Sequence, residues 1–276
     1  MENHPCLVDF RNPSYENFVR HMDYREQVEG ASPHALAHEW KTMQMFLRAY
    51  GIPIWPYKLP PTSSKRILPF PSKVVEFWNH KYSDDNYENA LYQYLFFHGF
   101  LLGLRIPSEL VALTVDDVII DDGHGEIIIT ERKKHNSQRT LIPEKAILTS
   151  RVHKSFKNWL DIWRPKVENQ YSGDALYLRP DGKPITIQYI GQKLSKHGKK
   201  VWKHFSPYDM RHWCAVARLI QTKVKIGNFD VYTVRNWLGH EKIATTQNYI
   251  RYAEQYYRQL PGDWISLVLK PRRRGG

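Results

Sequence analysis

The sequence has little cysteine and lacks a long apolar run. Its 276 residues include two cysteines, Cys6 and Cys214, which lie too far apart to suggest a disulfide framework and form no zinc-binding CxxC pair. The longest apolar run, Tyr94–Leu104, is about half the length of a membrane-spanning helix and is interrupted by His98. Residues 1–10 contain acidic side chains but no signal-peptide pattern. We therefore expect a cytoplasmic protein with no membrane partner.

Acidic residues are also scarce relative to basic ones. The chain has 40 Lys and Arg against 28 Asp and Glu, a formal net charge of +12, and residues 1–60 are close to neutral. A basic excess favours a polyanionic partner, and the clusters taken together favour nucleic acid, although any single basic cluster is more typical of a solvated surface. Charge alone does not separate a DNA enzyme from an RNA-binding protein. The candidate nucleic-acid-binding residues are Arg132, Lys133, Lys199, Lys200, Arg272 and Arg273.

The apolar pattern predicts a mainly α fold with a small antiparallel β-sheet, in two domains. Ser32 is a favourable helix N-cap, Pro33 suits the first turn, and apolar residues recur at helical spacing until Gly51. Residues 52–71 contain six prolines and little periodicity, which is typical of an extended connector. We place the domain boundary near residue 66, giving domains over residues 1–66 and 67–276.

Beyond the connector, the pattern predicts helices around a single β-hairpin. Residues 125–130 and 139–142 are β-like and flank the polar segment ERKKHNSQ. A turn is expected around residues 116–122. Helices are expected over residues 72–80, 86–102, 109–113, 147–163, 187–196, 208–221 and 231–237, with a last one beginning near residue 245.

Two kinds of phosphodiester chemistry are compatible with these residue types. The acidic group Asp116, Asp117, Asp121 and Asp122 offers carboxylates of the kind that hold metal ions in nucleases, but it flanks apolar residues in the expected turn, which favours solvated surface. The alternative needs no metal. Paired arginines neutralise the phosphate, a lysine or histidine donates a proton to the leaving oxygen, and a side-chain hydroxyl is the nucleophile.

Four segments together resemble the catalytic boxes of tyrosine recombinases. In chain order they are LLGLRIPSELVALTVDDV (101–118), ITERKKHNSQRTLIP (129–143), SPYDMRHWCAVARLI (206–220) and NWLGHEKIATTQNYIRY (236–252). Residues 32–51 also resemble the helical core-binding domain that precedes the catalytic domain in this family. The resemblance covers nearly the whole chain and is most specific in the last box. It implies a core-type DNA-binding domain followed by a tyrosine recombinase catalytic domain.

The resemblance implies a role for five residues. Arg105 and Arg211 match the arginines that clamp the scissile phosphate, and Glu109 matches an acidic residue that supports the clamp, although it lies one residue further from Arg105 than expected. His240 matches a donor to the phosphate. Tyr249 matches the nucleophile. An ordinary aromatic helix face is the alternative for this region, because further tyrosines occur at Tyr252, Tyr256 and Tyr257.

Two positions leave the assignment open. Lys134 is our choice for the hairpin lysine that protonates the 5′-oxygen in this family, with Lys133 as its rival, because the sequence does not give the register of the turn. Tyr208 occupies the position where the family usually has a histidine, and a phenol is a poor general base at neutral pH. His212 and His204 are alternative proton acceptors, and each is also compatible with a packed or exposed role.

The activity implied by the resemblance is site-specific DNA recombination through a 3′-phosphotyrosine intermediate, without metal, ATP or another cofactor. Double-stranded DNA and a homo-oligomer, a tetramer on two DNA sites, are the implied partners. We favour integration and excision of a mobile element. The alternatives are a Xer-like chromosome or plasmid dimer resolvase, a type IB topoisomerase and a cleavage-deficient DNA-binding protein. Residues 264–269 are expected to pack either on their own domain or on a neighbouring protomer.

Overall fold

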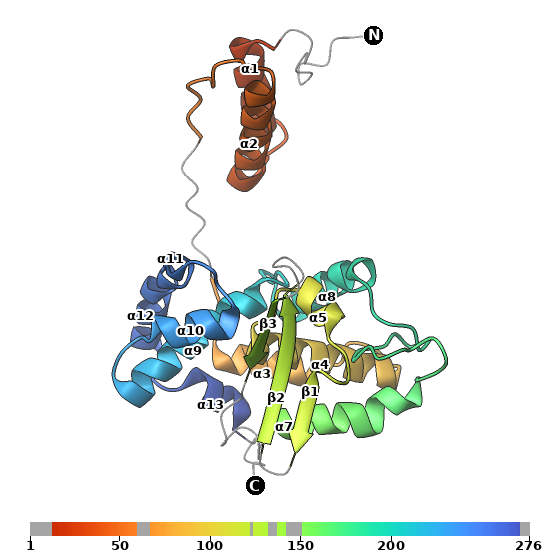
Figure 1. Cartoon of the computed structure of the whole chain (residues 1–276). Coiled ribbons are helices and arrows are strands. Elements are labelled where there is room, and N and C mark those ends of the chain that lie inside the picture. The colour runs from red at the N-terminus through yellow and green to blue at the C-terminus, as the bar shows by residue number, and fades with distance from the viewer. Residues whose placement is uncertain (1–12, 60–66, 122–123, 132–136, 142–150, 271–276) are drawn as a thin grey trace. The chain divides into compact units, whose positions relative to one another are not determined.

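The computed structural model describes residues 13–59, 67–121, 124–131, 137–141 and 151–270 (Figure 1). The chain divides into two compact units, Met1–Arg66 and Ile67–Gly276, and the division falls in the proline-rich stretch. Most of the described residues are helical, and the described strands form one antiparallel sheet. The predicted fold class, mainly α with a small antiparallel sheet, is confirmed.

The first unit is a pair of packed helices, α1 (Tyr15–Gln27) and α2 (Pro33–Ala49). The Ser32 hydroxyl accepts a hydrogen bond from the Ala35 amide, so Ser32 caps α2 as the sequence predicts. Glu39 on α2 binds Arg25 of α1 at 2.8 Å, which joins the two helices by an ion pair. Their shared core consists of Phe18, Met22, Leu36, Trp40, Met43 and Leu47.

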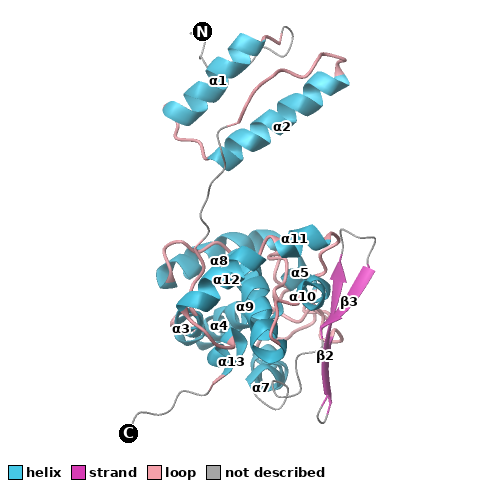
Figure 2. Ribbon diagram, turned by 90° about the vertical axis from the view of Figure 1, so that its left-hand side faces the viewer, coloured by secondary structure: helices cyan, strands magenta, loops and turns pink. Residues whose placement is uncertain are grey.

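The second unit is a body of helices with a sheet on one side, as Figure 2 shows. The strands are ordered β1-β2-β3, with α7 packed against β1, α5 against β2 and α10 against β3. The elements are α3 (Pro71–Asn79), α4 (Asn86–Leu102), α5 (Ser108–Ala112), β1 (Val118–Asp121), β2 (His124–Glu131), β3 (Ser137–Leu141), α7 (Arg151–Asn158), α8 (Ile187–Val201), α9 (Asp209–Ile226), α10 (Val231–Leu238), α11 (Ile243–Gln247), α12 (Ile250–Gln259) and α13 (Trp264–Leu269), with a π-helical turn over Trp159–Trp163 and a 3-10 turn over Arg164–Lys166.

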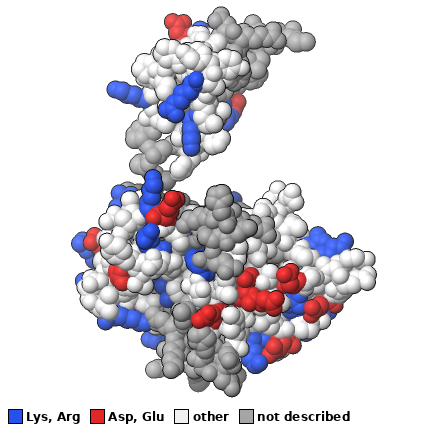
Figure 3. Space-filling view, viewed as in Figure 1, with Lys and Arg blue, Asp and Glu red and all other residues white. Residues whose placement is uncertain are grey.

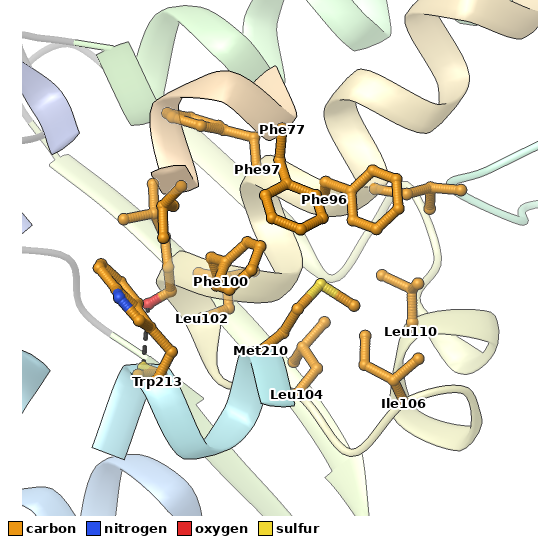
Figure 4. Close-up of a cluster of buried hydrophobic side chains, with 14 of the residues drawn as sticks. Phe77, Phe96, Phe97, Phe100, Leu102, Leu104, Ile106, Leu110, Met210 and Trp213 are labelled. Carbon is orange, nitrogen blue, oxygen red and sulfur yellow. Dashed lines mark hydrogen bonds between the residues drawn. The ribbon is translucent and has the colours of Figure 1, made fainter. Parts of the chain in front are cut away.

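The core of this unit lies between α3, α4 and α9 (Figure 4). From Tyr94 to Leu102, helix α4 is buried on every side, which is typical of a helix enclosed by its neighbours. Aromatic rings dominate the contacts, with Phe77 of α3 against Phe96 and Phe100 of α4, and Trp213 of α9 edge-on to Phe100. Burial of these rings stabilises the packing of α4 against α3 and α9.

Gly103 ends α4 and sets the direction of the chain toward Arg105. Its φ of 65° lies in the left-handed region, which favours glycine. A Cβ at this position would lie 2.8 Å from Cys214 Sγ and 2.8 Å from a methyl group of Leu238. Only glycine therefore combines this turn with close packing of α4 against α9 and α10.

The structure corrects some of the predicted elements. Residues 118–121, expected within a turn, form strand β1, which pairs with β2 from Val118↔Ile127 to Asp121↔His124. The predicted single helix near residue 245 is instead two helices, α11 and α12, with Tyr249 at their junction. Helices α8 and α9 extend further than predicted, to Val201 and Ile226. Residues 147–150 of a predicted helix lie outside the described residues.

Helix α13 packs on its own unit. Trp264 and Ile265 are fully buried, and the helix contacts α3 and α9. Asp263 caps α13 and accepts a hydrogen bond from Gln221 of α9 at 3.1 Å. Of the two packing arrangements that the sequence allows for residues 264–269, this structure has the one within a single chain. Among the described residues, no helix has both the length and the apolar character needed to cross a bilayer.

Candidate active site

A cleft of about 720 Å³ in the second unit brings together side chains from distant parts of the sequence. Arg105 comes from the segment after α4, Tyr208 and Arg211 from the start of α9, His240 from the turn after α10, and Tyr249 from the junction of α11 and α12. These are five of the six predicted catalytic residues. The sixth, Lys134, lies outside the described residues, as do Lys133, Arg132, Arg272 and Arg273.

Arg105 is held at the cleft by two groups. One terminal nitrogen of its guanidinium donates to Glu109 Oε1 at 2.8 Å, and the other donates to the Gly239 carbonyl at 3.0 Å. The second carboxylate oxygen of Glu109 accepts the Arg105 backbone amide at 2.7 Å. Glu109 therefore contacts Arg105 even though it lies one residue further along the chain than the resemblance leads us to expect.

Arg139 is a component of the site that the sequence analysis missed. Its two terminal nitrogens donate to the two oxygens of Glu109 at 3.0 and 2.8 Å, and its Nε donates to the Trp237 carbonyl at 3.2 Å. The β-register could have indicated this arrangement. Arg139 pairs with Ile129, which is buried, so both side chains lie on the inner face of the sheet.

Glu109 is the shared anion of a buried arginine cluster. Its side chain is 3% exposed, and Arg211 approaches it at 3.8 Å in addition to Arg105 and Arg139. Burial by itself raises the pKa of Glu109, but the hydrogen bonds and charges of Arg139, with the Arg105 amide and Arg211, outweigh it and hold the pKa below its usual value. The carboxylate is therefore ionised at neutral pH and fixes the arginines.

Arg211 is the most deeply buried cation of the cleft, with 1% of its side chain exposed. It donates to the carbonyls of Gly103, at 2.7 Å, and Leu238. Its buried Nε has no hydrogen-bond partner, although Arg211 lines the cleft. Burial lowers the pKa of Arg211, partly opposed by the charge of Glu109, and a guanidinium keeps its charge at neutral pH. Arg211 therefore contributes positive charge to the wall of the cleft.

The imidazole of His240 is fixed by a second residue that the sequence analysis missed. Gly239, with a φ of 64°, ends α10, and the His240 amide then donates to the Arg235 carbonyl. The His240 Nδ1 lies 2.8 Å from the hydroxyl of Thr246, which is fully buried. This hydrogen bond orients the ring. No sequence signal distinguishes Thr246 from the adjacent threonine.

Of Tyr249, Tyr252, Tyr256 and Tyr257, it is Tyr249 that lines this cleft. Its hydroxyl lies 2.5 Å from His212 Nδ1, and its ring lies parallel to that of His240 with the centroids 6.2 Å apart. Tyr256, in contrast, is buried and its hydroxyl accepts the Leu68 amide at 2.6 Å, so its role is structural. Tyr252 is half-buried and accepts a hydrogen bond from Arg251.

The remaining candidates lie around or away from this centre. Tyr208 is 43% exposed and its ring packs edge-on against His212, with 4.7 Å between the centroids. His204 is exposed and packs beside Trp202. The carboxylate of Asp117 accepts the Thr114 amide at 2.8 Å and so stabilises the turn before β1.

Lys199 and Lys200 are exposed in the last turn of α8 and are not part of the cleft lining. The face shown in Figure 3 carries acidic as well as basic side chains. The basic excess therefore does not cover this side of the molecule evenly. Charge alone does not define a binding surface here.

The sequence is similar to those of curated recombinases. It is 32% identical over 160 residues to tyrosine recombinase XerC of Caldanaerobacter subterraneus subsp. tengcongensis, covering 57% of this chain and 40% of the relative. It is 26% identical over 164 residues to tyrosine recombinase XerD of Staphylococcus saprophyticus, covering 59% of this chain and 50% of that protein. The matched region thus spans half or less of the length of these relatives.

Solved structures share the fold. The XerH site-specific recombinase bound to palindromic difH substrate, in a post-cleavage complex, matches with a TM-score of 0.63 at 17% identity, covering 92% of this chain and 73% of that one. The Tn1549 transposon integrase in complex with transposon right end DNA matches with a TM-score of 0.61 at 18% identity, covering 90% and 85%. The fold is therefore that of the tyrosine recombinases. The model of the phage integrase family matches residues 83–256, and the chain belongs to that family.

Proposed function

We propose that this protein is a site-specific DNA recombinase that cuts and rejoins DNA through a 3′-phosphotyrosine intermediate. The observation that carries the proposal is the convergence of Arg105, Arg211, His240 and Tyr249 on one cleft. Two of these residues are cations at any working pH, one is a hydrogen-bond donor, and one carries a nucleophilic hydroxyl. These residues supply the phosphate clamp and the nucleophile of phosphodiester transesterification, and the family resemblance assigns the same roles to them.

In the proposed step, the Tyr249 oxygen attacks a DNA phosphorus atom and the bond to the 5′-oxygen breaks. Arg105, Arg211 and His240 stabilise the negative charge that develops on the phosphoryl oxygens, a contribution on the order of several kcal/mol for preorganised donors. Lys134 gives a proton to the departing 5′-oxygen. A 5′-hydroxyl from another strand then reverses the step, so the bond energy is conserved without ATP.

The proposed partners follow from the family and from the charge of the chain. The helical unit over residues 1–66 is a core-type DNA-binding domain in this proposal, and residues 67–276 are the catalytic domain. Lys199, Lys200 and the basic residues outside the described parts contact phosphates of double-stranded DNA, which contributes affinity but not sequence preference. The active assembly is a tetramer on two DNA sites.

Two biological roles compete within this chemistry. We favour integration and excision of a mobile element from the sequence, and a structural relative is a transposon integrase. The curated relatives are XerC and XerD recombinases, which favours the Xer-like alternative. Mapping the cleavage positions trapped on DNA of the source genome separates the two. Cleavage at the ends of a mobile element supports an integrase, whereas a single chromosomal site supports a resolvase.

Covalent trapping on nicked DNA tests the function. The protein is incubated, in EDTA, with a library of duplexes that each carry a nick where the released strand can diffuse away. We expect a protein–DNA adduct that resists denaturation, and mass spectrometry should locate the phosphodiester on Tyr249. Cleavage that appears only when Mg²⁺ replaces EDTA would instead support a metal nuclease, and binding without any adduct would support a cleavage-deficient protein. Relaxation of plasmids of any sequence would support a topoisomerase.

The lysine assignment is tested by a change in the leaving group. We expect Lys134→Ala to slow cleavage of ordinary DNA by about 100-fold, the usual contribution of a general acid, and to cleave 5′-bridging phosphorothiolate DNA almost normally. A thiolate leaves without protonation, so this substrate does not need the lysine. Lys133→Ala is the matched control. If the sulfur rescues Lys133→Ala and not Lys134→Ala, the assignment of the two lysines is reversed.

Thr246 is expected to act through the orientation of His240. Thr246→Val keeps the shape of the buried side chain but removes the hydroxyl that binds His240 Nδ1. We expect the rate of adduct formation to fall about tenfold, which corresponds to ~1.4 kcal/mol. Thr246→Ser, which keeps the hydroxyl, should retain most of the rate. Equal rates for the valine and serine variants would show that this hydrogen bond does not matter for catalysis.

A further inference from the structure

His212 is placed to exchange a proton with the reacting atom of the proposed nucleophile. It lies on α9 directly after Arg211, and its Nδ1 is 2.5 Å from the Tyr249 hydroxyl. The two rings are 5.5 Å apart between centroids and inclined by 42°. Both side chains are half-buried. This contact is within the distance that proton transfer requires, before any DNA is bound.

We propose that His212 is the proton acceptor for Tyr249 in strand cleavage. The inference rests on the function proposed above. It assigns the base to the residue after the buried arginine, and not to position 208, where the family usually has a histidine and this chain has Tyr208. A neutral imidazole with its proton on Nε2 accepts the phenolic proton at Nδ1, and it does so far more readily at neutral pH than a neutral phenol would.

The Tyr249 O–H bond breaks while its oxygen forms a bond to phosphorus, and the proton moves to His212 Nδ1. The bond between phosphorus and the 5′-oxygen breaks, and that oxygen takes a proton from the general acid. In the joining step, the protonated His212 returns its proton to the departing oxygen of Tyr249. The imidazole is therefore neutral again after each complete cycle.

Tyr208 and His240, the two aromatic residues that line the cleft with Tyr249, make contacts that differ from those of His212. Tyr208 is more exposed than His212, and its ring packs edge-on against the imidazole, where it limits the orientations of His212. His240 Nδ1 is engaged by the buried Thr246 hydroxyl, and the His240 ring lies parallel to the Tyr249 ring. In this proposal, His212 accepts the proton of the phenolic oxygen, and His240 donates a hydrogen bond to the phosphate.

Substitution of His212 separates proton transfer from positioning. Gln at this position can still accept a hydrogen bond from the Tyr249 hydroxyl but cannot take up its proton. We expect His212→Gln and His212→Ala to form the covalent adduct about 100-fold more slowly than wild type, with unchanged affinity for DNA. His204→Gln, the matched control at an exposed histidine that does not line the cleft, should retain a rate close to that of wild type.

A second experiment uses a leaving group that does not need a proton from His212. DNA ending in a 3′-p-nitrophenyl phosphate is given to a Tyr249→Phe protein together with a 5′-hydroxyl strand. The p-nitrophenolate is a far weaker base than the phenolate of tyrosine, so it leaves without an acid. Adding His212→Ala to Tyr249→Phe should therefore leave the rate of this joining reaction nearly unchanged.

Three outcomes would overturn the role of His212. They are full adduct formation by His212→Gln, a 100-fold loss in His204→Gln, or a comparable loss when His212→Ala is tested on the p-nitrophenyl substrate. The last result would show that His212 acts on the phosphate or on the fold. Failure of the proposed function is a different observation, because the wild-type protein would then form no adduct on any nicked DNA.

Discussion

Tyr249→Phe is expected to abolish covalent adduct formation on nicked DNA while leaving DNA binding intact. The substitution removes one oxygen atom, and in the proposed mechanism no other group forms the bond to phosphorus. The fold should tolerate it, because the lost hydrogen bond to His212 contributes about 1 kcal/mol. Gel analysis of denatured reactions measures the adduct, and fluorescence anisotropy of labelled DNA measures the affinity.

Tyr252→Phe is the matched control for this experiment. Tyr252 lies three residues later on α12 and is also half-buried, but it is not among the residues that line the cleft. We expect it to form the adduct at the wild-type rate. If Tyr252→Phe lost the adduct while Tyr249→Phe kept it, the nucleophile would be Tyr252. The cleft lined by Tyr249 would then not be the reaction centre.

The large features of the fold follow from local patterns. Helix α2 is specified by Ser32, Pro33 and an apolar stripe, and α4 by an apolar run, interrupted by His98, that is typical of a helix enclosed by other helices. Strand β1 was missed because it has only four residues and follows a pair of aspartates in which a turn is equally plausible. Its pairing with β2 depends on tertiary packing, since a four-residue segment has too little pattern to define a strand.

Residues that belong to a sequence motif could be predicted to lie near one another. Residues that reach the cleft region through tertiary packing could not. Arg105 and Tyr249 come from boxes with fixed spacing, and the structure places both on one cleft. Arg139 and Thr246 act through other side chains, and their partners lie 30 and 6 residues away in the chain. The distance from His212 to Tyr249 likewise depends on how α9 meets the junction of α11 and α12. Sequence motifs do not encode that relation.

Glu109→Gln is expected to lower the stability of the second unit by about 3 kcal/mol, at the lower end of the range for breaking a buried ion pair. The amide keeps the shape but leaves Arg139 and the buried Arg211 without a compensating charge. In a unit of this size the melting temperature should fall by roughly 6–12 °C. Glu254→Gln, at an exposed position on α12, should change it little, within about 0.5 kcal/mol.

The pH dependence of the stability difference between wild type and Glu109→Gln identifies the cause of that difference. The pKa of Glu109 is lower in the folded protein than its ordinary value of 4.5, so its carboxylate stabilises the fold fully above that value and loses this effect as the pH falls through the folded pKa. Calorimetry should therefore show the largest gap between wild type and Glu109→Gln near neutral pH, and a narrowing gap below 4.5, because the protonated Glu109 is then as neutral as glutamine. A gap that stays constant down to the acid transition would mean that the substitution acts through packing and not through charge. In that case Glu109 would not be the anion that holds the arginines at the cleft.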